Sequence, residues 1–417
     1  MLRGWSPRRT RRAGASVGLG RAALLALLAA LLAAPASAQP HKPRCSDPQP
    51  GEILAICDFS GADLAGRDLS RTDLREANFQ RANLQGANLT GVLAGRANFS
   101  RAVLDGATLG GNFELALFRE AGLVRSDARQ GVFYRADFSG ARMERALFER
   151  ANLIEARLER ADLKGAGLRL ANLSGAVARR ADLSGADLAR AVLASSIFLE
   201  ARLTGSVLLE ANLSRADFTG AQLTDANLTG GYLFETDFRG ASLAGATLQR
   251  AVLIRPWLQG AEVSRLRNAP RWLTEAVAEG RYSTPRLARA IGKGLRDAQG
   301  ADLRNADLSG LDLSGVDFSY ADLSGANLGG DNLTGTLLLL AKLRGARIVG
   351  VNLSGAVLAG ADLTEAEIET HFRRESEYWG HIGEPRWVPT QTGDPAPSRP
   401  QPAAAAPEAT SPAPASR

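Results

Sequence analysis

From Phe59 onward, a large apolar residue returns at every fifth position, flanked by small and polar residues. Typical units are Ala62-Asp63-Leu64, Ala161-Asp162-Leu163 and Ala321-Asp322-Leu323. We call the Leu or Phe of each unit its centre. Centres run from Phe59 to Leu109, from Phe113 to Val263 and from Leu303 to Ile368. Leu or Phe fills all of them except Ala94, Ala128, Met143, Ala178, Val263, Ile348 and Ile368.

A period of five excludes both regular secondary structures as the explanation for a buried row of leucines. An α-helix turns by about 100° per residue, so a step of five would scatter the centres around its circumference. A straight strand alternates its faces, so an odd step would send successive centres to opposite sides. The pattern therefore predicts a chain that turns a corner once per unit and winds into a coil, with every centre pointing to a common axis.

The residues around each centre agree with such a coil. The position two before the centre is Ala in every unit from Ala136 to Ala191, which suits a narrow core filled by one large and one small residue per side. The Asp or Asn between them should point outward. Gly often stands two positions after the centre, as at Gly140 and Gly165, which suits a corner that needs a positive φ.

These units resemble the pentapeptide-repeat family, whose motif is Ala-(Asp/Asn)-Leu-x-x. The resemblance implies an all-β fold, the right-handed, quadrilateral, parallel β-helix of that family, with four five-residue sides per coil. Coils should then stack about 4.8 Å apart, with each centre above the centre 20 positions earlier. A predicted core ladder of this kind is Leu163, Leu183, Leu203, Leu223 and Leu243.

The repeat is interrupted twice. The step from Leu109 to Phe113 is four residues, which predicts a local irregularity without a domain boundary. Residues 264–300 separate a first part of the β-helix, 59–263, from a second part, 301–368.

Within this insert, Asn268-Ala269-Pro270 and Thr284-Pro285 predict the starts of two short helices. One apolar face would dock on outward side chains just upstream, and a partner-binding helical loop is the alternative. The expected docking residues are Phe234, Ile254, Trp257, Leu287, Ile291 and Leu295.

The N-terminus predicts export. Six arginines precede an apolar run from Ala22 to Ala34, which leads to Ala36-Ser37-Ala38. Residues 1–38 thus read as a signal peptide that is cleaved after Ala38, and the mature protein should be periplasmic or secreted. The run is shorter than a membrane span, so we expect no stable membrane insertion after cleavage. Both general secretion and twin-arginine export remain open.

The two ends of the coil should be capped. Cys45 and Cys57 are the cysteines of the chain, and in an oxidising compartment they predict a disulfide within an N-terminal cap, residues 39–58; two free thiols are the alternative. Aromatic residues in 369–388 predict a C-terminal cap, and the Pro- and Ala-rich segment 389–417 should be disordered.

Charge gives no support for a nucleic-acid ligand. The chain has 50 basic and 44 acidic residues, and removal of the six arginines of the signal peptide leaves 44 of each. Outward apolar residues are more informative, because adjacent coils could merge them into one interaction patch. The candidate patch is Val192, Ile197, Leu199, Val207 and Leu209.

Catalytic constellations are scarce, and we expect neither a cofactor nor an enzyme. The outward Asp residues belong to the repeat and carry no catalytic information. A metal shared by His371 and His381 with Glu375 or Glu377 is a weak alternative. The sequence favours a non-catalytic, exported structural and interaction protein with an unknown protein partner or self-association. The alternatives are a gyrase-binding DNA mimic of the kind known in this family and, more remotely, an enzyme with a site near the insert or the C-terminal cap.

Overall fold

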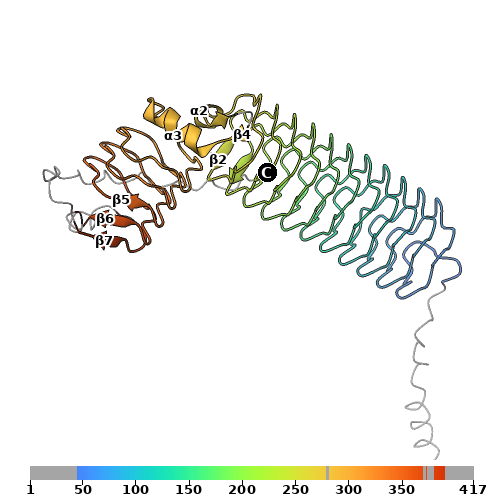
Figure 1. Cartoon of the computed structure of the whole chain (residues 1–417). Helices are drawn as coiled ribbons and strands as arrows, with labels where there is room; N and C mark the ends of the chain where they lie inside the picture. The colour runs from blue at the N-terminus through green and yellow to red at the C-terminus, as the bar shows by residue number, and fades with distance from the viewer. Residues whose placement is uncertain (1–44, 279–280, 370–371, 373–379, 390–417) are drawn as a thin grey trace, which may run out of the picture. The chain divides into compact units, whose positions relative to one another are not determined.

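The computed structural model describes residues 45–278, 281–369, 372 and 380–389. Parallel bridges recur every five residues and join residues 20 apart, as in Asp63 to Asn83 and Asp162 to Asp182. The chain therefore winds into coils of 20 residues that lie parallel to one another (Figure 1). The predicted signal peptide, residues 39–44 of the N-terminal cap and the tail from 390 onward lie outside the described residues.

Backbone hydrogen bonds between coils hold the stack together. The Leu163 N–H donates to the Asp182 carbonyl at 2.7 Å, and the Asp182 N–H donates to the Ala161 carbonyl at 2.9 Å. One such bridge forms on each five-residue side, so most sides are too short to count as strands. The longer parallel pairs are β1 (Tyr232–Phe234) with β2 (Val252–Ile254), and β5 (Arg347–Ile348) with β6 (Glu367–Glu369).

The core is a single apolar column inside the coils. Centres and the alanines two positions before them are almost all buried. Five phenylalanines from successive coils stack with ring centroids 4.8 to 4.9 Å apart, namely Phe59, Phe79, Phe99, Phe118 and Phe138. This spacing equals that of strands in a sheet, so identical side chains lie in contact along the axis.

The four-residue step shortens one coil without ending the stack. Leu93 pairs with Asn112 and Thr108 with Asp127, which are 19 apart, and the 20-residue spacing returns from Asn112 to Val132. Gly111 makes the shortened corner possible, because a Cβ there would lie 2.8 Å from the Val92 carbonyl oxygen. The predicted irregularity is therefore local.

The repeat extends further than the sequence predicts, both at its N-terminal end and on either side of the insert. Coil bridges begin at Ile53, inside the predicted cap, continue to Arg267 and resume at Asp297. We call residues 53–267 the first stretch and residues 297–369 the second stretch. The insert is thus residues 268–296 and not 264–300, because polar residues that look irregular in sequence still pair through their backbone.

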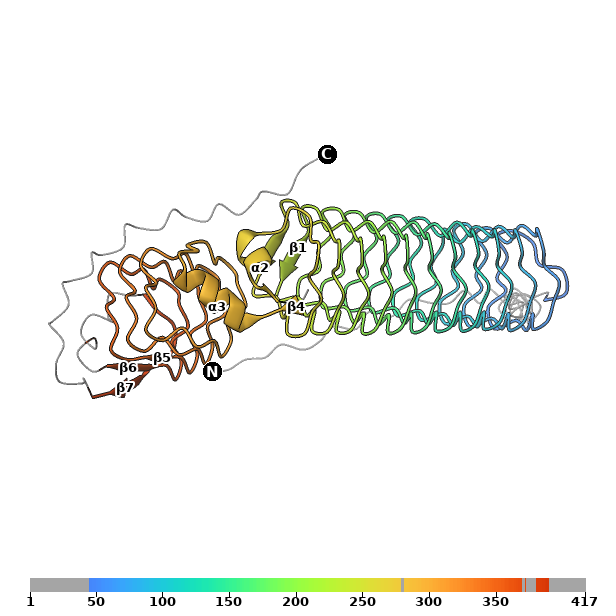
Figure 2. The ribbon, with the colours of Figure 1, turned by 45° about the horizontal axis from the view of Figure 1, so that its top comes forward.

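The insert contains two helices and a short antiparallel pair (Figure 2). Helix α2 (Arg271–Glu275) starts directly after Pro270, and α3 (Thr284–Gly292) starts after Ser283, whose side chain accepts a hydrogen bond from the Arg286 N–H. Both helices form where the prolines predict them. Between them, β3 (Val277–Ala278) pairs with β4 (Arg281–Tyr282).

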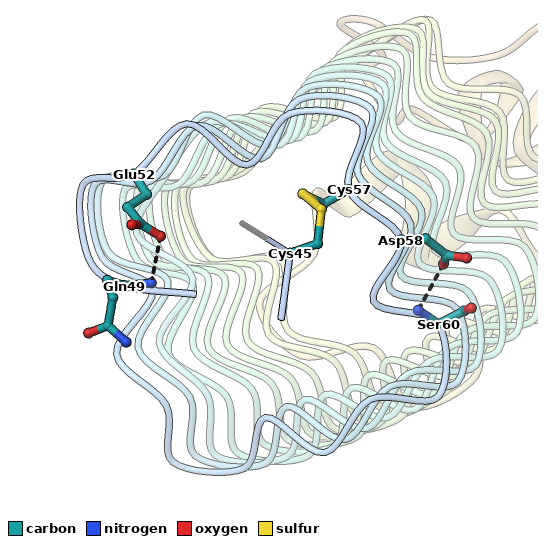
Figure 3. The surroundings of a disulfide bond; sticks show 6 residues. All are labelled: Cys45, Gln49, Glu52, Cys57, Asp58 and Ser60. Atoms are coloured by element: carbon teal, nitrogen blue, oxygen red, sulfur yellow. Dashed lines mark hydrogen bonds between the residues drawn. A yellow bond between two sulfur atoms is a disulfide. The ribbon is translucent and has the colours of Figure 1, made fainter. Parts of the chain in front are cut away.

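Both ends of the described coils are covered. At the N-terminal end a disulfide joins Cys45 to Cys57, with Cα atoms 5.6 Å apart, as the sequence predicts (Figure 3). At the other end β7 (Arg386–Val388) adds a parallel strand to β6, with Trp387 opposite Ile368. Phe372 is buried, whereas Tyr378 and Trp379 lie outside the described residues.

Candidate functional site

The outward Asp and Asn residues of the repeat stabilise its corners. The Asp182 carboxylate accepts a hydrogen bond from the Ser184 N–H at 3.0 Å, and the Asn172 side chain accepts one from the Ser174 N–H at the same distance. Such a bond to the residue two positions later is a known way to close a turn. In the same arrangement, hydrogen bonds from Ser60 lower the pKa of Asp58 (Figure 3). These acids therefore have a structural role that explains why they recur.

The predicted core ladder lies inside the coils. The five leucines come from successive 20-residue coils and all are buried: Leu163, Leu183, Leu203, Leu223 and Leu243. They fill the core and are not accessible to a ligand.

The predicted interaction patch does not form as one surface. Val192, Ile197 and Val207 belong to three different columns of bridged residues, next to Asn172, Val177 and Asp187 respectively. Leu199 and Leu209 lie in turns of two different corners, and all five side chains are half-buried. The prediction was wrong because neighbouring units of one coil face different sides.

A smaller apolar pair is exposed elsewhere. Tyr232 and Val252 are directly bridged across β1 and β2, with 55% and 41% of their surface exposed. Earlier coils of the same column carry both asparagine, at Asn152, Asn172 and Asn212, and apolar residues, at Val132 and Val192. From Asn112 onward the column first lacks asparagine at two consecutive 20-residue steps at this pair, a signal that is visible only once the column is known.

The predicted docking residues upstream of the insert contact arginines and the second stretch. Phe234 lies between two guanidinium groups, 5.5 Å from that of Arg215 and 4.9 Å from that of Arg255. Trp257 stacks on Arg304 of the second stretch, 3.6 Å from the ring centroid. Ile254 lies next to Gly300, where a Cβ would be 3.1 Å from the Ile254 Cα.

Helix α3 lies beside α2 and β3 of the insert. Its residues Leu287 and Ile291 are buried, as are Trp272 of α2 and Leu295 just after the helix. At its C-terminal end, Gly292 lies against the side chain of Leu311. The apolar residues of α3 are buried, and the structure places Gly300 and Arg304 of the second stretch next to Ile254 and Trp257.

A buried polar cluster joins the first stretch, the insert and the second stretch. We call Tyr282, Asp302 and Arg304 the clasp. Arg304 Nη2 lies 2.7 Å from Asp302 Oδ2, which also accepts a hydrogen bond from the Leu258 N–H at 3.4 Å. The Tyr282 hydroxyl donates to the carbonyl of Asp302. Burial raises the pKa of Asp302, although Arg304 opposes this, and burial also raises the pKa of Tyr282.

A second polar contact links residues that are 107 positions apart. Lys342 Nζ lies 2.7 Å from Glu235 Oε1, and Arg255 and Arg215 each approach the same carboxylate to 3.2 Å. Burial alone would raise the pKa of Glu235, but Lys342, Arg255 and Arg215 outweigh it and lower the pKa. Glu235 is thus an anion that three cations surround.

Among the residues that the structure describes, no group of three or more His, Cys, Asp or Glu side chains is arranged to hold a metal ion. The alternative metal site depends on His371, Glu375 and Glu377, which lie outside the described residues. No helix in the described part of the chain has the length and apolar content needed to cross a membrane.

Repeated five-residue sides, parallel bridges and an apolar axis define a β-helical repeat protein. The family model for pentapeptide repeats matches more than half of the chain, and the chain belongs to that family. The matched residues are 57–93, 132–169, 171–208, 196–231, 232–265, 299–335 and 336–369. A search of the curated proteins finds no match.

Several solved structures are similar to this chain. HetL of the cyanobacterium Nostoc sp. strain PCC 7120, involved in heterocyst differentiation regulation, is 29% identical, with a TM-score of 0.24; the match covers 52% of this chain and 90% of HetL. The plasmid-mediated fluoroquinolone resistance protein QnrB1 is 19% identical, with a TM-score of 0.25 and coverage of 48% and 89%. A pentapeptide repeat protein of the Arabidopsis thaliana thylakoid lumen is 22% identical, with a TM-score of 0.08 and coverage of 42% and 68%. These TM-scores are low, so we assign the family from the family model.

Proposed function

We propose that this chain is a non-catalytic, exported interaction protein, in which a right-handed, four-sided β-helix presents side chains to a protein partner. The 20-residue step between bridged residues, with one bridge every five residues, supports the four-sided form. The basic and apolar N-terminal segment and the disulfide between Cys45 and Cys57 support export to an oxidising compartment.

The exposed pair of Tyr232 and Val252 is the observation that carries the binding role. An aromatic and a β-branched side chain stand exposed on two successive coils, in a column that has asparagine at Asn152, Asn172 and Asn212. The coil itself does not need them there, because the asparagines of the same column support the same backbone bridges. Tyrosine at an exposed apolar site is typical of residues that anchor protein interfaces.

Asparagine substitutions test this role with little risk to the fold. We expect Y232N/V252N mature protein to lose at least about tenfold of its affinity for the partner captured from periplasmic extract, as truncation of an interface anchor does. V192N is the matched control, since Val192 belongs to the same column but is half-buried. Equal capture by all three proteins, with equal thermal unfolding, would contradict the proposal.

Sedimentation of the same variants separates a foreign partner from a second copy of this chain. A wild-type dimer that Y232N/V252N abolishes would identify the partner as another copy. Family membership keeps a gyrase-binding DNA mimic as the second candidate, although the mature chain balances 44 basic with 44 acidic residues. Inhibition of gyrase supercoiling by the mature protein, unaffected by Y232N/V252N, would favour the mimic.

A further inference from the structure

An ionisable residue occupies a core position of the second stretch. Asp331 stands two positions before the centre Leu333, where most units have a buried alanine, and only 2% of its surface is exposed. Its carboxylate Oδ1 accepts a hydrogen bond from the Leu311 N–H at 2.8 Å. The other oxygen, Oδ2, is buried without a hydrogen-bond partner among the described residues. A buried, half-satisfied carboxylate is costly when it carries its charge.

Threonine side chains at this inward position act as hydrogen-bond donors. The Thr236 hydroxyl donates to the Leu213 carbonyl at 2.9 Å, and the Thr336 hydroxyl donates to the Leu313 carbonyl at 3.0 Å. The inward corner thus offers carbonyl oxygens to a side chain. An ionised carboxylate can only accept hydrogen bonds, whereas a protonated carboxyl group also has an O–H to donate. The site therefore suits the protonated form.

The backbone around Asp331 differs from that of the neighbouring rungs. The Asn332 N–H reaches the Leu311 carbonyl at 3.3 Å, and the Asp331 N–H reaches the Leu328 carbonyl at 3.3 Å. The Asn327 N–H, which is equivalent to that of Asn332 one unit earlier, donates to the Ala306 carbonyl at 2.9 Å. The large Leu311 side chain is half-buried and lies against Gly292 of α3, where a Cβ would be 3.0 Å from a Leu311 methyl group. Asp331 thus accepts a hydrogen bond from the backbone of Leu311, the residue that the C-terminal end of α3 contacts.

We propose that Asp331 is a proton-binding site that couples pH to the packing of α3 on the second stretch. With the proton bound, the core around Leu311 and Asp331 is neutral and α3 is held. When the proton is lost, the charged carboxylate is stabilised by access to water, which the packed state denies it. The opening that admits water separates Leu311 from Gly292 and so loosens α3.

The pKa of Asp331 agrees with this direction. Burial, with a smaller contribution from the negative charge of Asp307, raises this pKa to about 7 against the opposing effect of the backbone N–H groups of Leu311 and Gly310. An acid with a raised native-state pKa stabilises the packed state at low pH. This stability is lost as the pH rises from the ordinary range of Asp, about 4, to about 7.

Other charged groups lie near the contact. On the repeat side these are Asp307 and Asp312, and Arg296 at the end of the insert pairs with Asp312 at 3.5 Å. On α3 they are Arg289 and Lys293, both exposed. All of them remain in a D331N variant, so a pH dependence that they caused would remain in it as well.

Hydrogen exchange of the mature full-length protein tests the proposal. After correction for the intrinsic exchange rate, the equilibrium constant for opening of residues 284–292 in the wild type should increase up to about a hundredfold between pH 5 and pH 7. D331N, a neutral isostere, and D331A, which restores the usual residue of the repeat, should both remove this increase. Residues 150–200 of the first stretch serve as the internal reference and should show no such change.

Two results would overturn the proposal. One is a wild-type α3 whose corrected exchange does not change between pH 5 and pH 7. The other is a D331N protein that keeps the wild-type increase, which would assign the effect to Asp307 or another group. D331N retains an acceptor for the Leu311 N–H, so the test remains available should D331A fold poorly.

Discussion

At the scale of single residues, the corner positions show how the repeat tolerates side chains in a conformation that favours glycine. Arg160 and Glu155, two positions after their centres, have φ values of 58° and 55°. A left-handed conformation costs a non-glycine residue about 1–2 kcal/mol. The Arg160 N–H donates to the Arg179 carbonyl at 2.9 Å, and the same rung forms at Gly165 with Ser184. The inter-coil hydrogen bonds thus impose the conformation whatever the side chain.

A pair of neighbouring substitutions tests the division between inward and outward residues. Leu223 is fully buried, whereas Gln222 on the same side is exposed. We expect L223A to lower the free energy of unfolding by about 2–5 kcal/mol, because it leaves a cavity in the core. Q222A should change it by less than about 0.5 kcal/mol. Urea unfolding followed by circular dichroism measures both, and equal effects would show that the coil does not bury its centres.

The inward residues could be predicted from the period alone, whereas the surface could not. A step of five places Leu223 in the core without knowledge of any other coil. The patch built from Val192, Ile197 and Val207 failed, because proximity in sequence does not place outward residues on one side of a coil. Tyr232 and Val252 are 20 positions apart and become neighbours only when the coils stack.

At the scale of elements, the insert shows how the repeat can be interrupted and resumed. Proline near the first turn predicts both helices, since this signal is local. The clasp could not be predicted, because Asp302 and Arg304 look like ordinary outward residues of a repeat unit. In the structure Asp302 supplies the acceptor for the Leu258 N–H. In other coils a backbone carbonyl of the next coil accepts this hydrogen bond. The Phe218 N–H, for example, donates to the main-chain carbonyl of Asp237.

Two arginines that flank Trp257 allow a controlled test of the clasp. Arg304 is buried with Asp302, whereas Arg239 pairs with Asp237 at the surface. R304M should lower the free energy of unfolding by about 3–5 kcal/mol, because it leaves a buried carboxylate without its cation. The D302N/R304M double variant should be more stable than R304M, since it removes that charge.

The matched variant R239M should cost less than about 1 kcal/mol, as expected for a surface ion pair. Chemical denaturation of the four proteins gives the comparison. A D302N/R304M protein that is less stable than R304M would contradict the role of the buried charge.

At the scale of the whole molecule, a repeat protein is stabilised mainly by contacts between adjacent coils. Most hydrogen bonds between coils join residues about 20 positions apart. The contact of Glu235 with Lys342 is different, because it ties the last coils of the first stretch to a coil well inside the second. Its loss should therefore affect how the two stretches unfold together and not the stability of either stretch alone.

The pH dependence of this contact should be opposite to that of Asp331. The three cations around Glu235 lower its pKa, so its stabilising effect is complete at neutral pH and is lost as the pH falls below the ordinary range of Glu, about 4.3. We expect E235Q to lower the free energy of unfolding by about 1 kcal/mol at pH 7, less at high salt, and to match the wild type more closely at pH 3. E200Q, which removes an exposed partner of Arg180 within the first stretch, is the control and should leave the cooperativity of unfolding unchanged. If E235Q unfolds with the same midpoint and the same single transition as the wild type at pH 7, Glu235 does not couple the two stretches, and the clasp and the backbone contact of Arg255 with Gly300 must hold them together.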